Sequence, residues 1–157
     1  MENSLDVLSE SLDMKIKLLN EIEEYNMQQK KSFEDEVPNM DSFDEAIEKK
    51  AELIERLEKL DDGFETLYEN LAQNLKVNKD KYADKIKSIQ NKISIITELS
   101  VSVQASEARN KKIIEDYFAK QKSSIAQNRR GSRVAYDYYK NMSGTGLRSS
   151  QFMDSKN

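Results

Sequence analysis

The chain has 157 residues, a length typical of one domain, and 34% of its residues are charged. It contains no histidine and no cysteine, which excludes thiol nucleophiles, disulfides, thiolate zinc sites and imidazole acid–base chemistry near neutral pH. With four glycines and one proline, it also lacks the turn-forming residues that a many-stranded sheet needs. We therefore expect an all-α protein that is not an enzyme and holds no metal or cofactor.

The charge of the chain is unevenly distributed. Residues 1–76 carry nine basic and 21 acidic side chains, whereas residues 77–157 carry 16 basic and eight acidic ones. This pattern indicates an acidic first half packed beside a basic second half, although a basic surface for an acidic partner is an alternative. The N-terminus is acidic and no apolar stretch approaches the ~20 residues that span a bilayer, so we expect no membrane insertion and a cytoplasmic location.

The first predicted helix runs from about Ser4 to Phe33, with Ser4 as its N-cap. Its apolar residues recur at steps of three and four, which places them on one stripe of an α-helix. These residues are Leu5, Leu8, Leu12, Ile16, Leu19 and Ile22. The apolar stripe fades after Ile22.

A break around Pro38 separates this helix from a second one, which we place from about Phe43 to Lys76. Ser42 and Glu45 have the spacing of a capping box, in which the side chains of the two residues cap the start of a helix. The apolar residues of this helix form three adjoining heptad stripes, so we expect it to pack against at least two other helices. Gly63 lies within the helix and indicates a close helix approach or a mild bend.

Residues 76–81 are polar and predict a turn, because the apolar stripe changes its heptad phase across them; a continuous helix with a stutter is the alternative. The third predicted helix runs from about Lys81 to Asn128 and would be roughly 70 Å long. Its apolar stripe is interrupted by a polar stretch from Gln104 to Lys112. We therefore expect its last turns to extend beyond the bundle, or the helix to break near residues 100–106.

The sequence thus predicts an antiparallel bundle of about three long amphipathic helices, with an extended C-terminal helix, in residues 1–128. Residues 129–157 are basic, contain linker-like glycines and serines, and are expected to form a flexible tail. The stretch from Val134 to Met142 concentrates tyrosines and could become ordered on a partner.

The residues that follow the polar stretch of the third helix are the candidate binding surface. They are Ile113, Ile114, Tyr117, Phe118 and Ile125. An apolar helical surface left uncovered would accept another amphipathic helix, but burial in the same bundle or in a homodimer explains these residues equally well.

Two other patterns have simpler explanations. The abundant carboxylates read as a solvated helix face rather than a metal site, because the chain lacks the histidines of di-metal bundles. Basic residues between Lys111 and Arg133 are interleaved with aromatic residues, which is a mixture that nucleic-acid binding would use. The acidic net charge and the lack of a folded nucleic-acid motif make this the least favoured interpretation.

Three segments resemble the FlgN-like family of flagellar export chaperones. Residues 44–64 resemble the second helix of that family, and residues 107–114 resemble its Glu-x-x-Asn segment. Residues 150–156 also resemble the C-termini of such proteins.

The resemblance implies a non-catalytic chaperone that binds the C-terminal helices of hook–filament junction proteins, keeps them competent for export and delivers them to the export gate. In that family the C-terminal part contacts the client, which points to the five residues named above and, more weakly, to Tyr136, Tyr138 and Tyr139. The alternatives are a structural coiled-coil scaffold that acts by self-association and a helical protein associated with nucleic acid.

Overall fold

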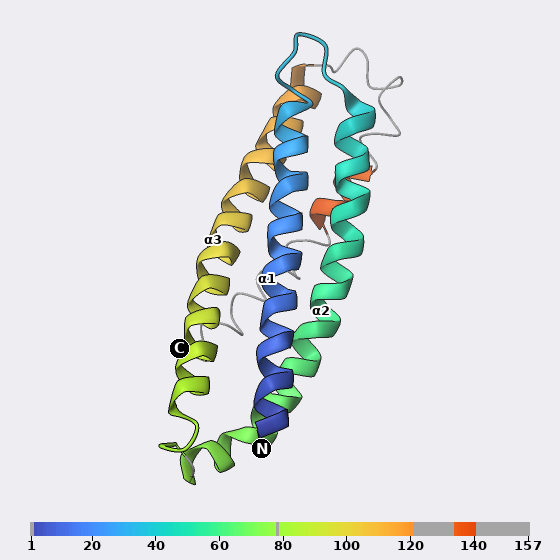
Figure 1. Cartoon of the computed structure of the whole chain (residues 1–157). Helices are drawn as coiled ribbons and strands as arrows, with labels where there is room; N and C mark the ends of the chain where they lie inside the picture. The colour runs from blue at the N-terminus through green and yellow to red at the C-terminus, as the bar shows by residue number, and fades with distance from the viewer. Residues whose placement is uncertain (1, 78, 121–133, 141–157) are drawn as a thin grey trace.

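The computed structural model describes residues 2–77, 79–120 and 134–140. Three long helices, α1 (Glu2–Lys31), α2 (Met40–Val77) and α3 (Ala83–Lys120), form an up–down–up bundle, and the described residues 134–140 are also helical (Figure 1). No strand occurs in this part of the chain. The expected all-α bundle of three long amphipathic helices is therefore confirmed.

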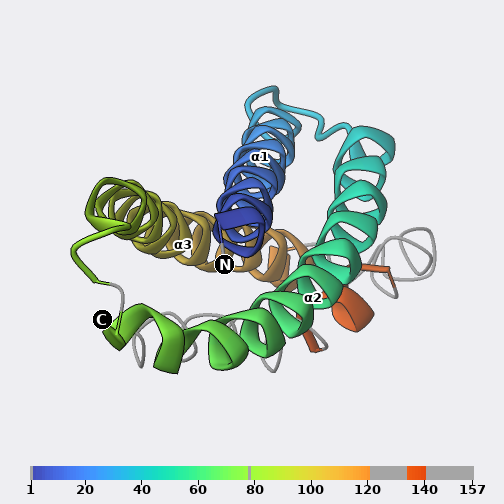
Figure 2. The ribbon, with the colours of Figure 1, turned by 60° about the horizontal axis from the view of Figure 1, so that its bottom comes forward.

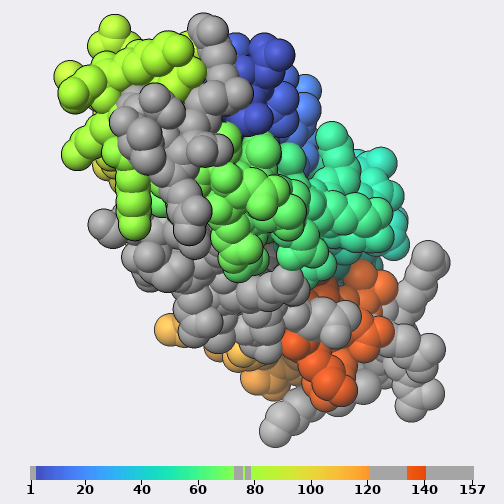
Figure 3. Space-filling model, turned by 90° about the horizontal axis from the view of Figure 1, so that it is seen from below, coloured from blue at the N-terminus to red at the C-terminus, as the bar shows by residue number. Residues whose placement is uncertain are grey.

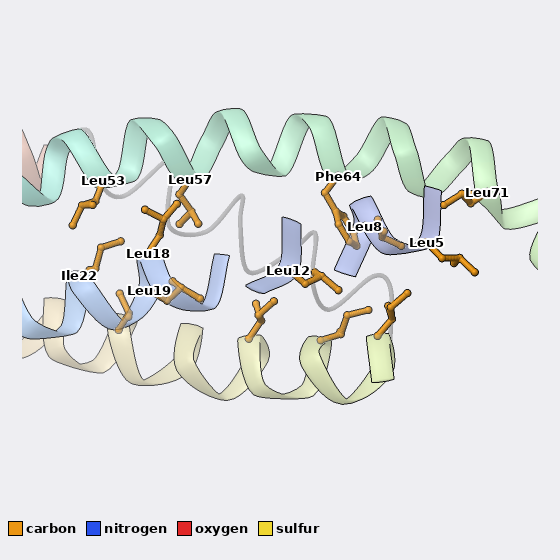
Figure 4. Close-up of a cluster of buried hydrophobic side chains, with 14 residues drawn as sticks. Leu5, Leu8, Leu12, Leu18, Leu19, Ile22, Leu53, Leu57, Phe64 and Leu71 are labelled. Atoms are coloured by element: carbon orange, nitrogen blue, oxygen red, sulfur yellow. The ribbon is translucent and has the colours of Figure 1, made fainter. Parts of the chain in front are cut away.

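Helix α1 lies between α2 and α3 and packs against both of them along its length (Figures 1 and 2). Its apolar stripe meets the stripes of the two longer helices in the main core, which Figure 4 shows. The buried members are Leu5, Leu8, Leu12, Leu18, Leu19, Ile22, Leu53, Leu57, Phe64, Leu71, Ile89, Ile93, Ile96 and Val103. This core accounts for the heptad spacing of all three helices.

The starts of the first two helices differ from the prediction. Helix α1 begins at Glu2, so Ser4 lies inside it and is not its N-cap. Helix α2 begins at Met40, and the Asn39 side-chain oxygen accepts a hydrogen bond of 3.0 Å from the Ser42 backbone N–H. The predicted Ser42 capping box is therefore wrong: Asn39, an equally good capping residue that follows directly after Pro38, caps the helix three residues earlier.

The chain reverses direction between α2 and α3, as the phase shift predicted. Residues 79–82 form turns, and the first hydrogen bond at the start of α3 joins the Ile86 N–H to the Tyr82 carbonyl at 2.9 Å. Helix α3 is continuous through residues 100–106, so of the two alternatives expected for this helix the break is wrong. Its 38 described residues equal those of α2 and give both helices a length of about 57 Å. The predicted end at Asn128 lies outside the described residues.

Gly63 does not mark a close approach of two helices. A Cβ atom built on this residue would meet nothing within 4 Å. In the described part of the chain, no helix combines the length and the apolar composition that crossing a bilayer requires.

Candidate partner-binding site

The three apolar stripes become polar at the same level of the bundle. On α1 the step of three and four residues continues beyond Ile22 to Asn26 and Gln29, which are both buried. Lys50 occupies the heptad position between Phe43 and Leu57 on α2 and is fully buried. On α3 the buried stripe likewise continues through polar residues, which are Ser100, Glu107 and Asn110.

We call Asn26, Gln29, Lys50, Glu107 and Asn110 the polar layer. Lys50 is its centre: its Nζ atom donates hydrogen bonds to Glu107 Oε1 at 2.5 Å and to Asn26 Oδ1 at 2.7 Å. Burial lowers the pKa of Lys50 to about 8, and the attraction of Glu107 opposes this effect. A single lysine thus links all three helices through polar groups that are removed from solvent.

The amides of the polar layer join α1 to α3. Asn110 Nδ2 donates to the backbone carbonyl of Asn26 at 3.1 Å and lies 3.4 Å from Gln29 Oε1. Arg109 donates to the same Asn26 carbonyl at 3.3 Å. Because buried polar groups are costly unless they are hydrogen-bonded, these contacts set the position of α3 along α1.

The helix at residues 134–140, which we call the C-terminal segment, completes the polar layer. The Tyr138 hydroxyl donates to Glu107 Oε1 at 2.9 Å, and Lys50 Nζ lies 4.5 Å from the centroid of the Tyr138 ring. Gln29 Nε2 donates to the Tyr139 hydroxyl at 3.1 Å. Burial raises the pKa of both tyrosines, and the negative charge of Glu107 raises it further, so both phenols stay protonated.

An aromatic cluster lies next to the polar layer, towards the connection between α1 and α2. The Phe33 ring meets Phe43 and Tyr117 edge to face, with ring centroids 5.3 Å apart in each pair. Ile47, Ile114 and Phe118 pack in the same cluster. Ala135 and Tyr138 are buried against it, and in Figure 3 the C-terminal segment, coloured orange-red, lies at the molecular surface beside α2.

The predicted binding residues divide into three groups. Ile114 is buried, Tyr117 and Phe118 are half-buried, and the aromatic cluster brings them together with Tyr138 and Tyr139. Two residues do not join the cluster: Ile113 is half-buried, and Tyr136 points outward with 66% of its surface exposed. Ile125 lies outside the described residues.

The apolar surface near the end of α3 is covered by the chain itself. Phe33 covers it from the connection between α1 and α2, Phe43 covers it from α2, and Ala135 and Tyr138 cover it from the C-terminal segment. The sequence left open whether this apolar surface is uncovered or buried in the same bundle. Ile114 is buried in the same bundle. Part of the expected flexible tail is therefore a docked helix, because its apolar side chains fit between α2 and α3.

The polar layer is not evident from the apolar periodicity of the three helices. Residues 104–112 look polar on all sides of the helix, which hides the fact that Glu107 and Asn110 keep the core spacing between Val103 and Ile114. Extending each apolar stripe by its own period would have found them, and Lys50 as well. No rule of spacing would have shown that the three polar stretches meet.

The described residues contain no group of three or more acidic side chains placed to hold a metal ion. What the site presents is an apolar surface with buried hydrogen-bonding groups at one edge. Comparisons of the chain with protein-family models, with curated proteins and with solved structures found no match.

Proposed function

We propose that this chain is a non-catalytic chaperone that binds an amphipathic helix of another protein. The binding site is the surface on which the C-terminal segment lies, which we call the segment-binding surface. It consists of Gln29, Phe33, Phe43, Ile47, Lys50, Glu107, Ile114 and Phe118. The resemblance to FlgN-like chaperones points to the C-terminal helices of hook–filament junction proteins as clients.

The observation that carries this proposal is the helical state of residues 134–140. An isolated helix shorter than about 12 residues is only marginally stable in water, because its few hydrogen bonds do not offset the free energy of nucleation. The seven described residues of this segment pack on the segment-binding surface, which therefore contributes to their helical state. A surface that orders one short amphipathic helix has the properties needed to order another.

The composition of the surface fits the same role. The apolar side chains Phe43, Ile47 and Ile114 provide area whose burial favours association by about 25 cal/mol per Å². Glu107 and Lys50 lie beside them and supply directional contacts. An apolar floor with a polar edge is the arrangement that proteins use to bind the apolar face of a helix.

Binding of synthetic C-terminal helices of hook–filament junction proteins to the full chain tests the proposal, measured by calorimetry. We expect binding that is lost in Phe118→Asp, because this half-buried residue lies in the aromatic cluster. Val101→Asp is the matched control, since Val101 lies on the same helix but is 60% exposed. Circular dichroism of both variants checks that the bundle is intact.

Two outcomes would contradict the proposal. One is a full chain that binds none of these helices. The other is equal binding by the Phe118→Asp and Val101→Asp variants. Light scattering that shows a stable oligomer without client binding would instead favour a scaffold that acts by self-association. Tight, salt-sensitive binding to single- or double-stranded nucleic acid would favour a helical protein associated with nucleic acid.

A further inference from the structure

We infer that the C-terminal segment competes with the partner for the segment-binding surface, and that this surface selects a helix presenting a tyrosine hydroxyl to Glu107. The inference rests on the proposed function and specifies the chemistry of the partner.

The segment is suited to being displaced. Of its side chains only Ala135 and Tyr138 are buried, whereas Tyr136, Asp137 and Lys140 are exposed. A longer amphipathic helix could bury more apolar area on the same surface. The segment offsets this disadvantage by being covalently attached, because short tethers give effective concentrations on the order of millimolar.

The selection for tyrosine follows from Glu107. Its Oε1 atom accepts hydrogen bonds from Lys50 and from the Tyr138 hydroxyl. Its Oε2 atom is buried and has no hydrogen-bond partner among the described residues. A helix with phenylalanine at the Tyr138 position would leave this buried carboxylate with the Lys50 contact alone, whereas tyrosine restores the second donor.

Lys50 strengthens the selection. Its Nζ atom lies over the Tyr138 ring as well as beside the Glu107 carboxylate. An aromatic ring at this position therefore interacts with a cation through its face and with an anion through its hydroxyl. Aliphatic side chains provide neither contact, so the surface distinguishes tyrosine from leucine as well as from phenylalanine.

The test uses a fluorescent peptide with the sequence of residues 131–142 of this chain, added to the full chain and followed by anisotropy. In the chain variant Ala135→Asp, a charge at the most buried position loosens the attached segment. We expect the peptide to bind this variant at least about tenfold more tightly than the unaltered chain. Tyr136→Asp is the control on the exposed face and should leave the affinity unchanged.

The second arm of the test compares peptides. A peptide with phenylalanine in place of Tyr138 should bind the Ala135→Asp chain about tenfold more weakly than the tyrosine peptide, as the loss of a hydrogen bond to a charged group predicts. In a chain that carries Glu107→Gln together with Ala135→Asp, this ratio should shrink. Circular dichroism of each chain checks the fold.

Equal affinity of the peptide for the unaltered and Ala135→Asp chains would overturn the competition. Equal affinity of the tyrosine and phenylalanine peptides would overturn the selection. Either failure is distinct from failure of the proposed function. If junction-protein helices bind the unaltered and Ala135→Asp chains equally, the proposed function stands and the competition fails. If the peptide behaves as expected but no junction-protein helix binds, the competition stands and the proposed function fails.

Discussion

Lys50 of α2 and Glu107 of α3, 57 positions apart in the sequence, form an ion pair with a distance of 2.5 Å between Nζ and Oε1. Both side chains are buried. The two helices are otherwise linked mainly through α1, which packs against each of them (Figure 2). The pair is thus a direct connection between α2 and α3, and it lies where the C-terminal segment docks.

Removal of one partner of this pair should destabilise the bundle strongly. A single Lys50→Met substitution leaves the Glu107 charge buried without its cation, which we expect to cost about 3–5 kcal/mol of unfolding free energy. The double variant Lys50→Met with Glu107→Leu removes both charges and should recover most of this loss. Urea unfolding of the two variants measures both values, and a double variant as unstable as the single one would contradict this account.

The stability of the protein should depend on pH through the same lysine. Burial lowers the Lys50 pKa from 10.5 to about 8, although the Glu107 and Glu23 carboxylates raise it, while Arg109 lowers it further. Between pH 8 and 10.5 the unfolded chain holds a proton that the folded chain has released, so the Lys50 contribution to the unfolding free energy rises with pH.

The two docked tyrosines act in the opposite direction at higher pH. Their pKa values are raised in the folded chain, so above about pH 10 the unfolded chain releases protons that the folded chain keeps. Their contribution therefore falls as the pH rises through this range. Urea unfolding from pH 7 to 11 should show a rise and then a fall, and Lys50→Met should abolish the rise. A rise of the same size in that variant would show that Lys50 is not its source.

The two neighbouring isoleucines near the end of α3 should differ in their contributions to stability. Ile114 is 2% exposed in the aromatic cluster, so Ile114→Ala should cost about 2–5 kcal/mol of unfolding free energy. Ile113 is half-buried and lies outside that cluster, so Ile113→Ala should cost less than about 1 kcal/mol. Urea unfolding compares them, and equal losses would mean that the aromatic cluster is not packed as described.

Gly63 offers a stabilising substitution. Its position in α2 is helical and exposed, and an added Cβ would meet no neighbour within 4 Å. Gly63→Ala should raise the unfolding free energy by about 0.5–1 kcal/mol, because alanine loses less conformational entropy than glycine on helix formation. Thermal unfolding should show a midpoint higher by about 1–4 °C. A lower midpoint would indicate that α2 needs the glycine.

The helical architecture follows from the sequence because periodicity is a local property. The steps of three and four from Leu5 to Ile22 predict one buried helical face, and the phase shift around residues 76–81 favours a reversal over a continuous helix with a stutter. The exact starts of helices were less well determined, because Asn39 and Ser42 are both good caps and only one can cap α2.

The site was decided by the tertiary structure. Lys50, Glu107 and Asn26 keep the spacing of the buried stripes, but their side chains are of charged or amide types that are ordinarily exposed. They are buried because the bundle brings the three polar stretches to one level. There Lys50 donates hydrogen bonds to both Asn26 and Glu107. The docking of Tyr138 depends on the same coincidence: contacts between residues distant in the sequence require helix positions that no local pattern contains.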